Sequence, residues 1–133
     1  MSNGPVSGNG IPITLPPGKI VFWSAMVQAA RGQLVQIKDS ADRVVFTATG
    51  ASPDGHSPTQ IGQGFFQPSD PSAAYTVWLG TGDGVWSSVL WAADQIALGD
   101  TAYLTKYVFG TEDGTDLDFN DTFLQVQYFD AVG

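Results

Sequence analysis

The part of the chain best suited to chemistry is a short acidic segment near its C-terminus. Five of the 13 acidic residues lie between Glu112 and Asp121, and no Lys or Arg follows Lys106. Carboxylates about 4 Å apart repel each other by roughly 4 kcal/mol at an effective dielectric constant of about 20, and no cation close in sequence relieves this repulsion. A bound divalent cation would relieve it, so the segment is a candidate metal site.

The donor atoms of this segment are all oxygen, which favours one metal in particular. Oxygen ligands at high coordination number are typical of Ca²⁺, whereas Mg²⁺ keeps more of its waters. The candidate ligands are the carboxylates of Glu112, Asp116, Asp118 and Asp121 and the amide of Asn120. Ligands on alternate residues fit a loop that wraps an ion, and the donors would suffice for two ions. An EF-hand is excluded, because Gln127 occupies the place of its final Glu.

Other interpretations of the acidic segment remain open on these residues alone. The segment could be a solvated acidic turn, or a calcium site that only stiffens a β-sandwich. Glu112 and Asp116 could formally act as the carboxylate pair of a glycoside hydrolase. However, four carboxylates in one short loop favour the capture of a metal over an acid poised for catalysis. Serine hydrolase chemistry also lacks a plausible base partner, so we predict a protein without catalytic activity.

The composition predicts the scaffold that must position this segment. Lys plus Arg number only 5 and Glu112 is the single Glu, so residues that favour exposed helices are scarce. The 16 Gly and 8 Pro favour turns between strands. The absence of Cys excludes disulfides, and the single His excludes a multi-His zinc site within one chain. A net charge of −8 makes nucleic acid and anionic membranes poor partners.

Short strands separated by turn signals predict one all-β domain, an antiparallel β-sandwich. We expect residues 1–10 to be a flexible N-terminal lead-in and residues 11–133 to form the single domain. Ala92–Leu98 could form a helical turn instead of continuing a strand. The predicted strands, nine in number, are Ile11–Leu15, Lys19–Ala30, Gln33–Lys38, Arg43–Ala48, Thr59–Gln67, Ala73–Leu79, Val85–Ala92, Thr101–Phe109 and Thr122–Phe129.

The acidic segment also resembles a known motif. It reads Glu-Asp-Gly-Thr-Asp-Leu-Asp-Phe-Asn-Asp from Glu112 to Asp121. This resembles the calcium loop of the calcium-dependent fucose/mannose-binding bacterial lectins of the PA-IIL type, with Phe119 in place of Tyr. Residues 24–35 are similar to the first long strand of these lectins and the loop after it. The middle of the chain, roughly residues 47–108, is longer than in the family and aligns only weakly.

The resemblance implies a nine-stranded β-sandwich with a C-terminal calcium-binding loop, which forms homodimers or tetramers. It implies two adjacent Ca²⁺ ions per site, to which vicinal hydroxyls of mannose- or fucose-type sugars coordinate directly. The chain would then be a lectin; the alternative is a calcium-stabilised structural or adhesive module that binds no sugar. Metal binding is implied for Glu112, Asp116, Asp118, Asn120, Asp121, the backbone carbonyl of Gln28 and the terminal carboxylate of Gly133 in the partner's site. Sugar binding is implied for Asp113, Asp116, Asp118 and the loop residues Ala29, Ala30 and Arg31.

The sequence supports several further expectations. The N-terminus has neither the basic nor the apolar region of a secretory signal, so we expect a cytoplasmic protein, with release or surface display by another route. No stretch of about 18 apolar residues predicts membrane insertion. The partners expected are glycans and further copies of the chain. Trp78, Trp86 and Trp91 are expected in the core, with a sugar-stacking platform as the alternative, and His56 is expected on the surface.

Overall fold

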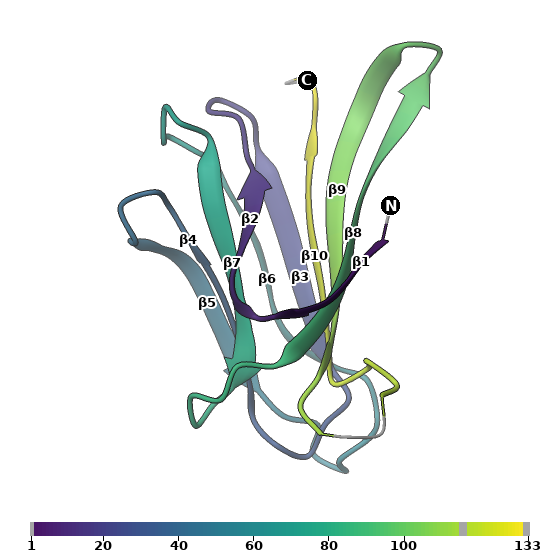
Figure 1. Cartoon of the computed structure of the whole chain (residues 1–133). Helices are drawn as coiled ribbons and strands as arrows, with labels where there is room; N and C mark the ends of the chain where they lie inside the picture. Colours follow the sequence, from purple (N-terminus) through teal and green to yellow (C-terminus); the bar gives the residue numbers. More distant parts are fainter. Residues whose placement is uncertain (1, 115–116, 132–133) are drawn as a thin grey trace.

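The computed structural model describes residues 2–114 and 117–131, and these form strands, turns and loops (Figure 1). A six-stranded sheet has the order β1-β8-β9-β10-β3-β6, and a four-stranded sheet has the order β2-β7-β4-β5. The strands are β1 (Ser2–Ser7), β2 (Asn9–Thr14), β3 (Val21–Val27), β4 (Gln33–Lys38), β5 (Val44–Gly50), β6 (Thr59–Phe66), β7 (Ala74–Thr81), β8 (Ser88–Leu98), β9 (Thr101–Glu112) and β10 (Thr122–Phe129). The predicted all-β sandwich is confirmed, with ten strands in place of nine. Among the described residues, no helix is long and apolar enough to cross a membrane.

The core lies between the two sheets, because alternate side chains of each strand point inward. In β4, for example, Gln33, Val35 and Ile37 are buried while the residues between them are partly exposed. Across the interior, the Trp23 ring of one sheet stacks on the Phe46 ring of the other, with 3.9 Å between ring centroids. Burial of such apolar surface contributes about 25 cal/mol per Å² and is the main force that holds the sheets together.

The N-terminal segment differs from the expected lead-in. Residues Ser2–Ser7 form β1, an edge strand that pairs antiparallel with β8 from Ser2↔Ala92 to Ser7↔Ser88. The chain then passes at Gly8 to the other sheet, where β2 pairs with β7. Pro5 and the small polar residues around it gave no strand signal. An edge strand tolerates them, since one side of its backbone needs no ladder partner.

The segment Ala92–Leu98 is extended, so the helical-turn alternative is wrong. It continues β8, which pairs with β9 without interruption by a helix, from Ser88↔Glu112 to Leu98↔Thr101. A two-residue turn of Gly99 and Asp100 closes this hairpin, and Gly99 has φ +60°. Gly at a positive φ is the usual requirement of such tight hairpin turns. The long hairpin sets the register of β9, and β9 ends at the acidic segment.

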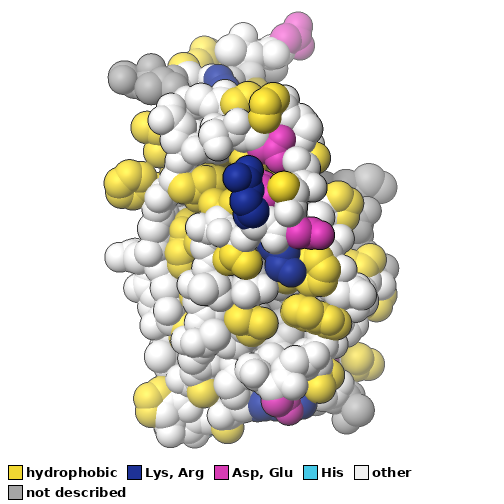
Figure 2. Space-filling view, turned by 90° about the vertical axis from the view of Figure 1, so that its left-hand side faces the viewer, with side chains coloured by type: hydrophobic (Ala, Val, Ile, Leu, Met, Phe, Trp, Pro, Cys, Tyr) yellow, Lys and Arg dark blue, Asp and Glu magenta, His cyan; other side chains and the backbone are white. Residues whose placement is uncertain are grey.

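The aromatic residues are divided between the interior and the surface. Trp91 is partly buried and stacks on Phe109, in agreement with the expected core packing. Trp78 and Trp86 pack edge to face against each other, and the Lys38 ammonium lies 4.0 Å from the Trp78 ring centroid. These two residues lie outside the core cluster, which corrects the expectation for them. Figure 2 shows the side of the molecule that carries the four-stranded sheet, where apolar side chains are scattered over the surface and charged side chains gather in a few small groups.

The strand register brings three loops together at one end of the sandwich (Figure 1). Thr122 of β10 pairs with Val27 of β3, so the segment between β9 and β10 lies beside the loop after β3. The Gln28 amide donates a hydrogen bond to the Asp121 carbonyl over 3.0 Å. The Ser52 amide in turn donates to the Ala29 carbonyl over 2.8 Å, which attaches the loop between β5 and β6.

Gly8→Ala tests whether the N-terminal strand is part of the fold. A Cβ at this position would lie 2.1 Å from the Leu79 carbonyl oxygen. That backbone atom accepts a hydrogen bond from the Ser87 amide over 3.0 Å, and the Leu79 amide donates to the Gly8 carbonyl over 2.8 Å, so it cannot move away without disturbing these bonds. We expect the free energy of unfolding to fall by about 1–3 kcal/mol, as measured by urea denaturation. The matched control is Gly32→Ala, because nothing lies within 4 Å of its added Cβ. Equal stability of the two variants would mean that residues 1–10 are a lead-in after all.

Candidate metal and sugar site

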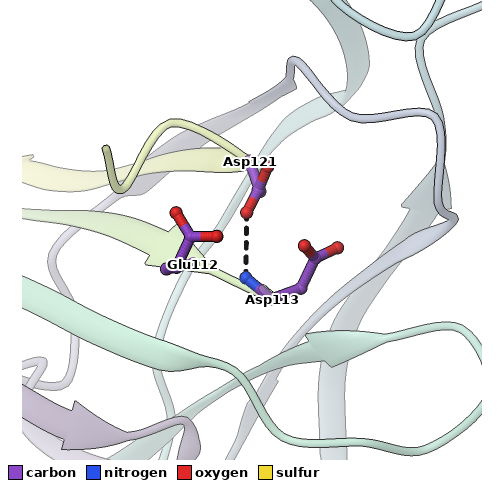
Figure 3. Close-up of side chains that lie close together, drawn as sticks. All are labelled: Glu112, Asp113 and Asp121. Carbon is purple, nitrogen blue, oxygen red and sulfur yellow. Dashed lines mark hydrogen bonds between the residues drawn. The ribbon is translucent and has the colours of Figure 1, made fainter. Parts of the chain in front are cut away.

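Three carboxylates meet where β9 ends and β10 begins. Glu112 is the last residue of β9, Asp113 follows it, and Asp121 precedes Thr122 at the start of β10. One carboxylate oxygen from each lies within 4.8 Å of the others (Figure 3). Glu112 is only 4% exposed, and Asp113 and Asp121 are partly buried. Burial strengthens the mutual repulsion of these groups, so the fold must hold them together against it.

Backbone hydrogen bonds hold the segment in this arrangement. The Asp113 amide donates to Asp121 Oδ2 over 2.8 Å, the contact drawn in Figure 3. The Gly114 amide donates to Glu112 Oε2 over 2.9 Å, and the Phe119 amide to Oε1 over 3.3 Å. The Asp121 amide donates to the Thr111 carbonyl over 3.0 Å. The described part of the segment is therefore folded around the Glu112 carboxylate, which accepts bonds from residues on both sides of the loop.

Gln33 supports the carboxylate cluster from the interior of the sandwich, and the sequence did not predict this role. It is fully buried at the start of β4. Its side-chain amide nitrogen donates to Asp113 Oδ2 over 2.8 Å and to the Arg31 carbonyl over 3.0 Å, and its amide oxygen accepts from the Thr122 hydroxyl over 3.1 Å. The signal was present, because Gln33 shares the inward alternation of Val35. A polar side chain in a buried position needs partners, and two of the three partners of Gln33, Asp113 and Thr122, are far away in sequence.

The predicted site residues converge on one hollow of ≈ 310 Å³. Its lining residues are Gln28, Ala29, Ala30, Arg31, Gly55, His56, Asp113, Asp118, Asn120 and Asp121. Glu112 joins this set through its contact with Asp113 and Asp121. Two other predicted residues, Asp116 and Gly133, lie outside the described residues. Gly55 and His56 were not predicted to belong to the site, because their loop is distant in sequence from both segments that carry the resemblance.

The three residues of the loop after β3 that are predicted to bind sugar differ in what they can offer a ligand. Ala29 is 6% exposed, and its carbonyl is bonded to Ser52, so it contributes little side-chain surface. Ala30 is exposed and offers only a methyl group. Arg31 points to the turn before β8, where its Nη2 lies 3.2 and 3.1 Å from the two carboxylate oxygens of Asp83. This loop therefore provides few side-chain donors that are not already engaged.

Burial and neighbouring charge raise the pKa of Asp121. Partial burial raises the pKa of Asp121 above its ordinary value of 3.8, and the carboxylates of Asp113 and Asp118 raise it further. The hydrogen bond from the Asp113 amide acts in the opposite direction. A cation that binds at this carboxylate must displace the proton, so calcium affinity should fall as the pH falls through the raised pKa.

The acidic segment also contains backbone strain. Leu117 and Phe119 have φ of 58° and 52°, in the left-handed region that non-glycine residues avoid. Such a conformation costs roughly 1–2 kcal/mol per residue. The segment is also packed closely against β9, because a Cβ added at Gly110 would lie 2.8 Å from the Phe119 carbonyl oxygen. Strain of this kind concentrates at binding sites, where the surrounding structure over-determines the backbone.

A comparison with known protein families gives one match over most of the chain. The model of the fucose-binding lectin II (PA-IIL) family matches residues 13–130. The matched segment contains both walls of the hollow predicted from the sequence, residues 28–31 and 113–121. A search of curated proteins found no significant match to the chain.

Solved structures of bacterial lectins have the same fold. A high-affinity mannose-binding lectin of Ralstonia solanacearum is 26% identical, with a TM-score of 0.72 and coverage of 92% of this chain and 96% of that chain. The C-terminal domain of the BC2L-C lectin from Burkholderia cenocepacia is 22% identical, with a TM-score of 0.72 and coverage of 96% and 100%. The lectin CV2L of Chromobacterium violaceum, in complex with α-methyl-fucoside, is 23% identical, with a TM-score of 0.69 and coverage of 92% and 96%. At these identities, the last two support the fold alone.

Asp121→Asn should raise the stability of the calcium-free protein by an amount that grows with pH. The unfolded chain loses this proton near 3.8, whereas the folded chain retains it to higher pH because the pKa is raised. Over that interval the folded state binds more protons, so this group lowers the free energy of unfolding as the pH rises. Asn keeps an acceptor for the Asp113 amide but carries no charge. Urea denaturation in EDTA at several pH values measures the difference between the two proteins.

The control for this comparison is Asp100→Asn, which removes one charge from the exposed β8–β9 turn. We expect it to follow the wild type at each pH. If the stability difference between Asp121→Asn and the wild type stayed constant or shrank as the pH rose, the burial and repulsion assigned to Asp121 would be wrong.

Proposed function

Because the chain belongs to the fucose-binding lectin II family, we propose that its acidic loop holds calcium and that mannose- or fucose-type sugars bind there. Lectins bind carbohydrate without transforming it, so the chain is a sugar-binding protein and not an enzyme. The observation that carries the proposal is the convergence of both predicted segments on one hollow, beside three carboxylates within 4.8 Å of one another. This convergence joins residues 28–31 to residues 113–121.

The residues present fit a calcium site. The donors are carboxylate, amide and carbonyl oxygens, which are the ligands that Ca²⁺ prefers. Closely spaced carboxylates that are partly buried are costly unless a cation compensates them. The residues that would hold two ions are Glu112, Asp116, Asp118, Asn120 and Asp121, with the backbone carbonyl of Gln28. Hydrogen bonds hold the described part of this segment in place, and this supports the proposal. Ligands that are already fixed lose little entropy when an ion binds.

The side chains around the hollow would determine which ligands enter. Calcium, when bound, supplies a poorly hydrated cation to which vicinal sugar hydroxyls can coordinate more strongly than to neutral protein groups. Asp113 would accept a hydrogen bond from a sugar hydroxyl, and Gln33 holds its carboxylate in position through the 2.8 Å bond to Oδ2. Ala30 would border the sugar without a side-chain hydrogen bond. The acidic lining disfavours anionic ligands, so the proposed ligands are neutral sugars.

The choice of sugar rests on the relatives. The matching family is described as fucose-binding, the Ralstonia relative as mannose-binding, and the Chromobacterium relative was solved with α-methyl-fucoside. Mannose and fucose both carry vicinal hydroxyls that can act as a bidentate ligand. We therefore assign glycans with these sugars as the partners of this chain.

Two further proposals concern assembly and location. We propose a homodimer, or a tetramer built from it, in which the terminal carboxylate of Gly133 reaches the calcium site of the partner. We also propose a cytoplasmic location, from which the protein would reach glycans by release or surface display.

An immobilised mannose column, run with calcium and with EDTA, tests the proposed function. We expect the wild type to be retained in calcium and released by EDTA. Asp118→Asn removes a carboxylate that lines the hollow, so it should pass through in both buffers while circular dichroism still reports a β-fold. Asp100→Asn removes the same charge far from the hollow, at the β8–β9 turn, and should behave as the wild type.

The column also separates the lectin from the alternative of a calcium-stiffened structural module. Such a module would pass through mannose and fucose columns in both buffers, even if calcium raised its Tm. Retention of Asp118→Asn at wild-type strength would mean that Asp118 is wrongly assigned as a ligand on the basis of the family resemblance.

A further inference from the structure

The hollow has a third wall that neither the sequence motifs nor the family resemblance assigned. The loop between β5 and β6 contributes Gly55 and His56 to the lining, together with the loop after β3 and the acidic segment. The sequence predicted a surface position for His56 and no contact with a ligand. Its position raises the question of what it could recognise in a ligand that is anchored at the carboxylates.

This loop is fixed to the site rather than loosely attached. Ser52 is 4% exposed, and its hydroxyl lies 3.0 Å from the Val27 carbonyl and 2.8 Å from the Ser57 carbonyl, either of which can accept its proton. Its amide donates to Ala29 over 2.8 Å. One buried serine therefore joins the end of β3 and the loop after it to the loop that carries His56.

Asp54 fixes the tip of the same loop. Its carboxylate accepts the amide hydrogens of His56 over 3.1 Å and of Ser57 over 2.7 Å, together with the Ser57 hydroxyl. Gly55 has φ +84°, which allows the tight turn that these bonds close. The backbone of His56 is thus held before any ligand arrives, and little ordering entropy remains to be lost on binding.

The residues in and around the hollow differ in how exposed they are to solvent. Glu112 at the carboxylate cluster is 4% exposed, whereas the His56 side chain is 81% exposed. His56 therefore stands at the rim, beyond the group that the carboxylates would anchor. Arg31, the other large basic residue of the lining, is engaged by Asp83. Among the described lining residues, His56 is the aromatic one, and its exposed ring lies at the edge of the hollow.

We propose that the loop of residues 51–58 forms a second sugar subsite, in which His56 contacts the sugar next to the one anchored at the acidic segment. The inference rests on the proposed function and adds that the protein prefers neutral oligosaccharides to monosaccharides. An imidazole suits this position, because its ring face can pack against the C–H face of a pyranose. Its Nδ1 lies 3.0 Å from the Asp54 carbonyl oxygen, so Nε2 is the ring nitrogen that would bond a sugar hydroxyl. The surrounding carboxylates exclude anionic sugars from the same place.

Calorimetric titration of the calcium-saturated protein tests the subsite. The probes are methyl α-mannoside and the α1–2-, α1–3- and α1–6-linked mannobioses. We expect at least one mannobiose to bind about 5–10-fold more tightly than the monosaccharide, a gain of about 1.0–1.4 kcal/mol. His56→Ala should bind the monosaccharide within about twofold of the wild type and lose the gain for the disaccharide. Gln60→Ala, an exposed residue outside the hollow, should keep it.

The outcomes distinguish this inference from the proposed function. If the wild type bound none of the four probes, the proposed function would fail and the subsite with it. If the wild type bound the monosaccharide but gained nothing from any mannobiose, the subsite alone would be overturned. The same holds if His56→Ala kept the full gain.

Discussion

The close approach of three carboxylates is the interaction on which the site depends. Glu112, Asp113 and Asp121 come together only because β9 and β10 pair in a fixed register and close the acidic segment between them. The surrounding backbone amides and Gln33 hold the carboxylates, but each of these donors is neutral. The raised pKa of Asp121 and the left-handed backbone at Phe119 both reflect a loop held in a costly state. A cation would offset this cost, and a solvated acidic turn would have no reason to sustain it.

The sandwich positions the acidic segment between β9 and β10 by holding three segments of the chain together at one end. β3, β9 and β10 are neighbours in the larger sheet, while β4 in the smaller sheet carries Gln33 across the interior to Asp113. The loops after β3 and β5 are joined by Ser52, so two of the three walls of the hollow are coupled. The site thus uses both sheets, and the hydrophobic packing between them fixes the distances among its donors.

Local sequence signals predicted the strands that alternate cleanly and the loop with a distinctive motif. β4 and β10 were placed at their observed bounds, because alternation of apolar and polar residues is a strong signal. The edge strand β1 was missed, since its Gly- and Pro-rich sequence is stabilised only by pairing with β8. Gln33 and His56 were missed as site residues for a related reason. Their roles depend on partners about 80 and 60 residues away in sequence, and a single sequence does not record such contacts.

Calorimetric titration of calcium into protein stripped with EDTA is the most direct test of the central claim. We expect uptake of two ions per chain, and heat from added methyl α-mannoside only after calcium is present. No calcium binding at neutral pH would contradict the proposed calcium site, because the clustered carboxylates would then be tolerated without a bound cation. Sugar binding of equal strength in EDTA would contradict it as well.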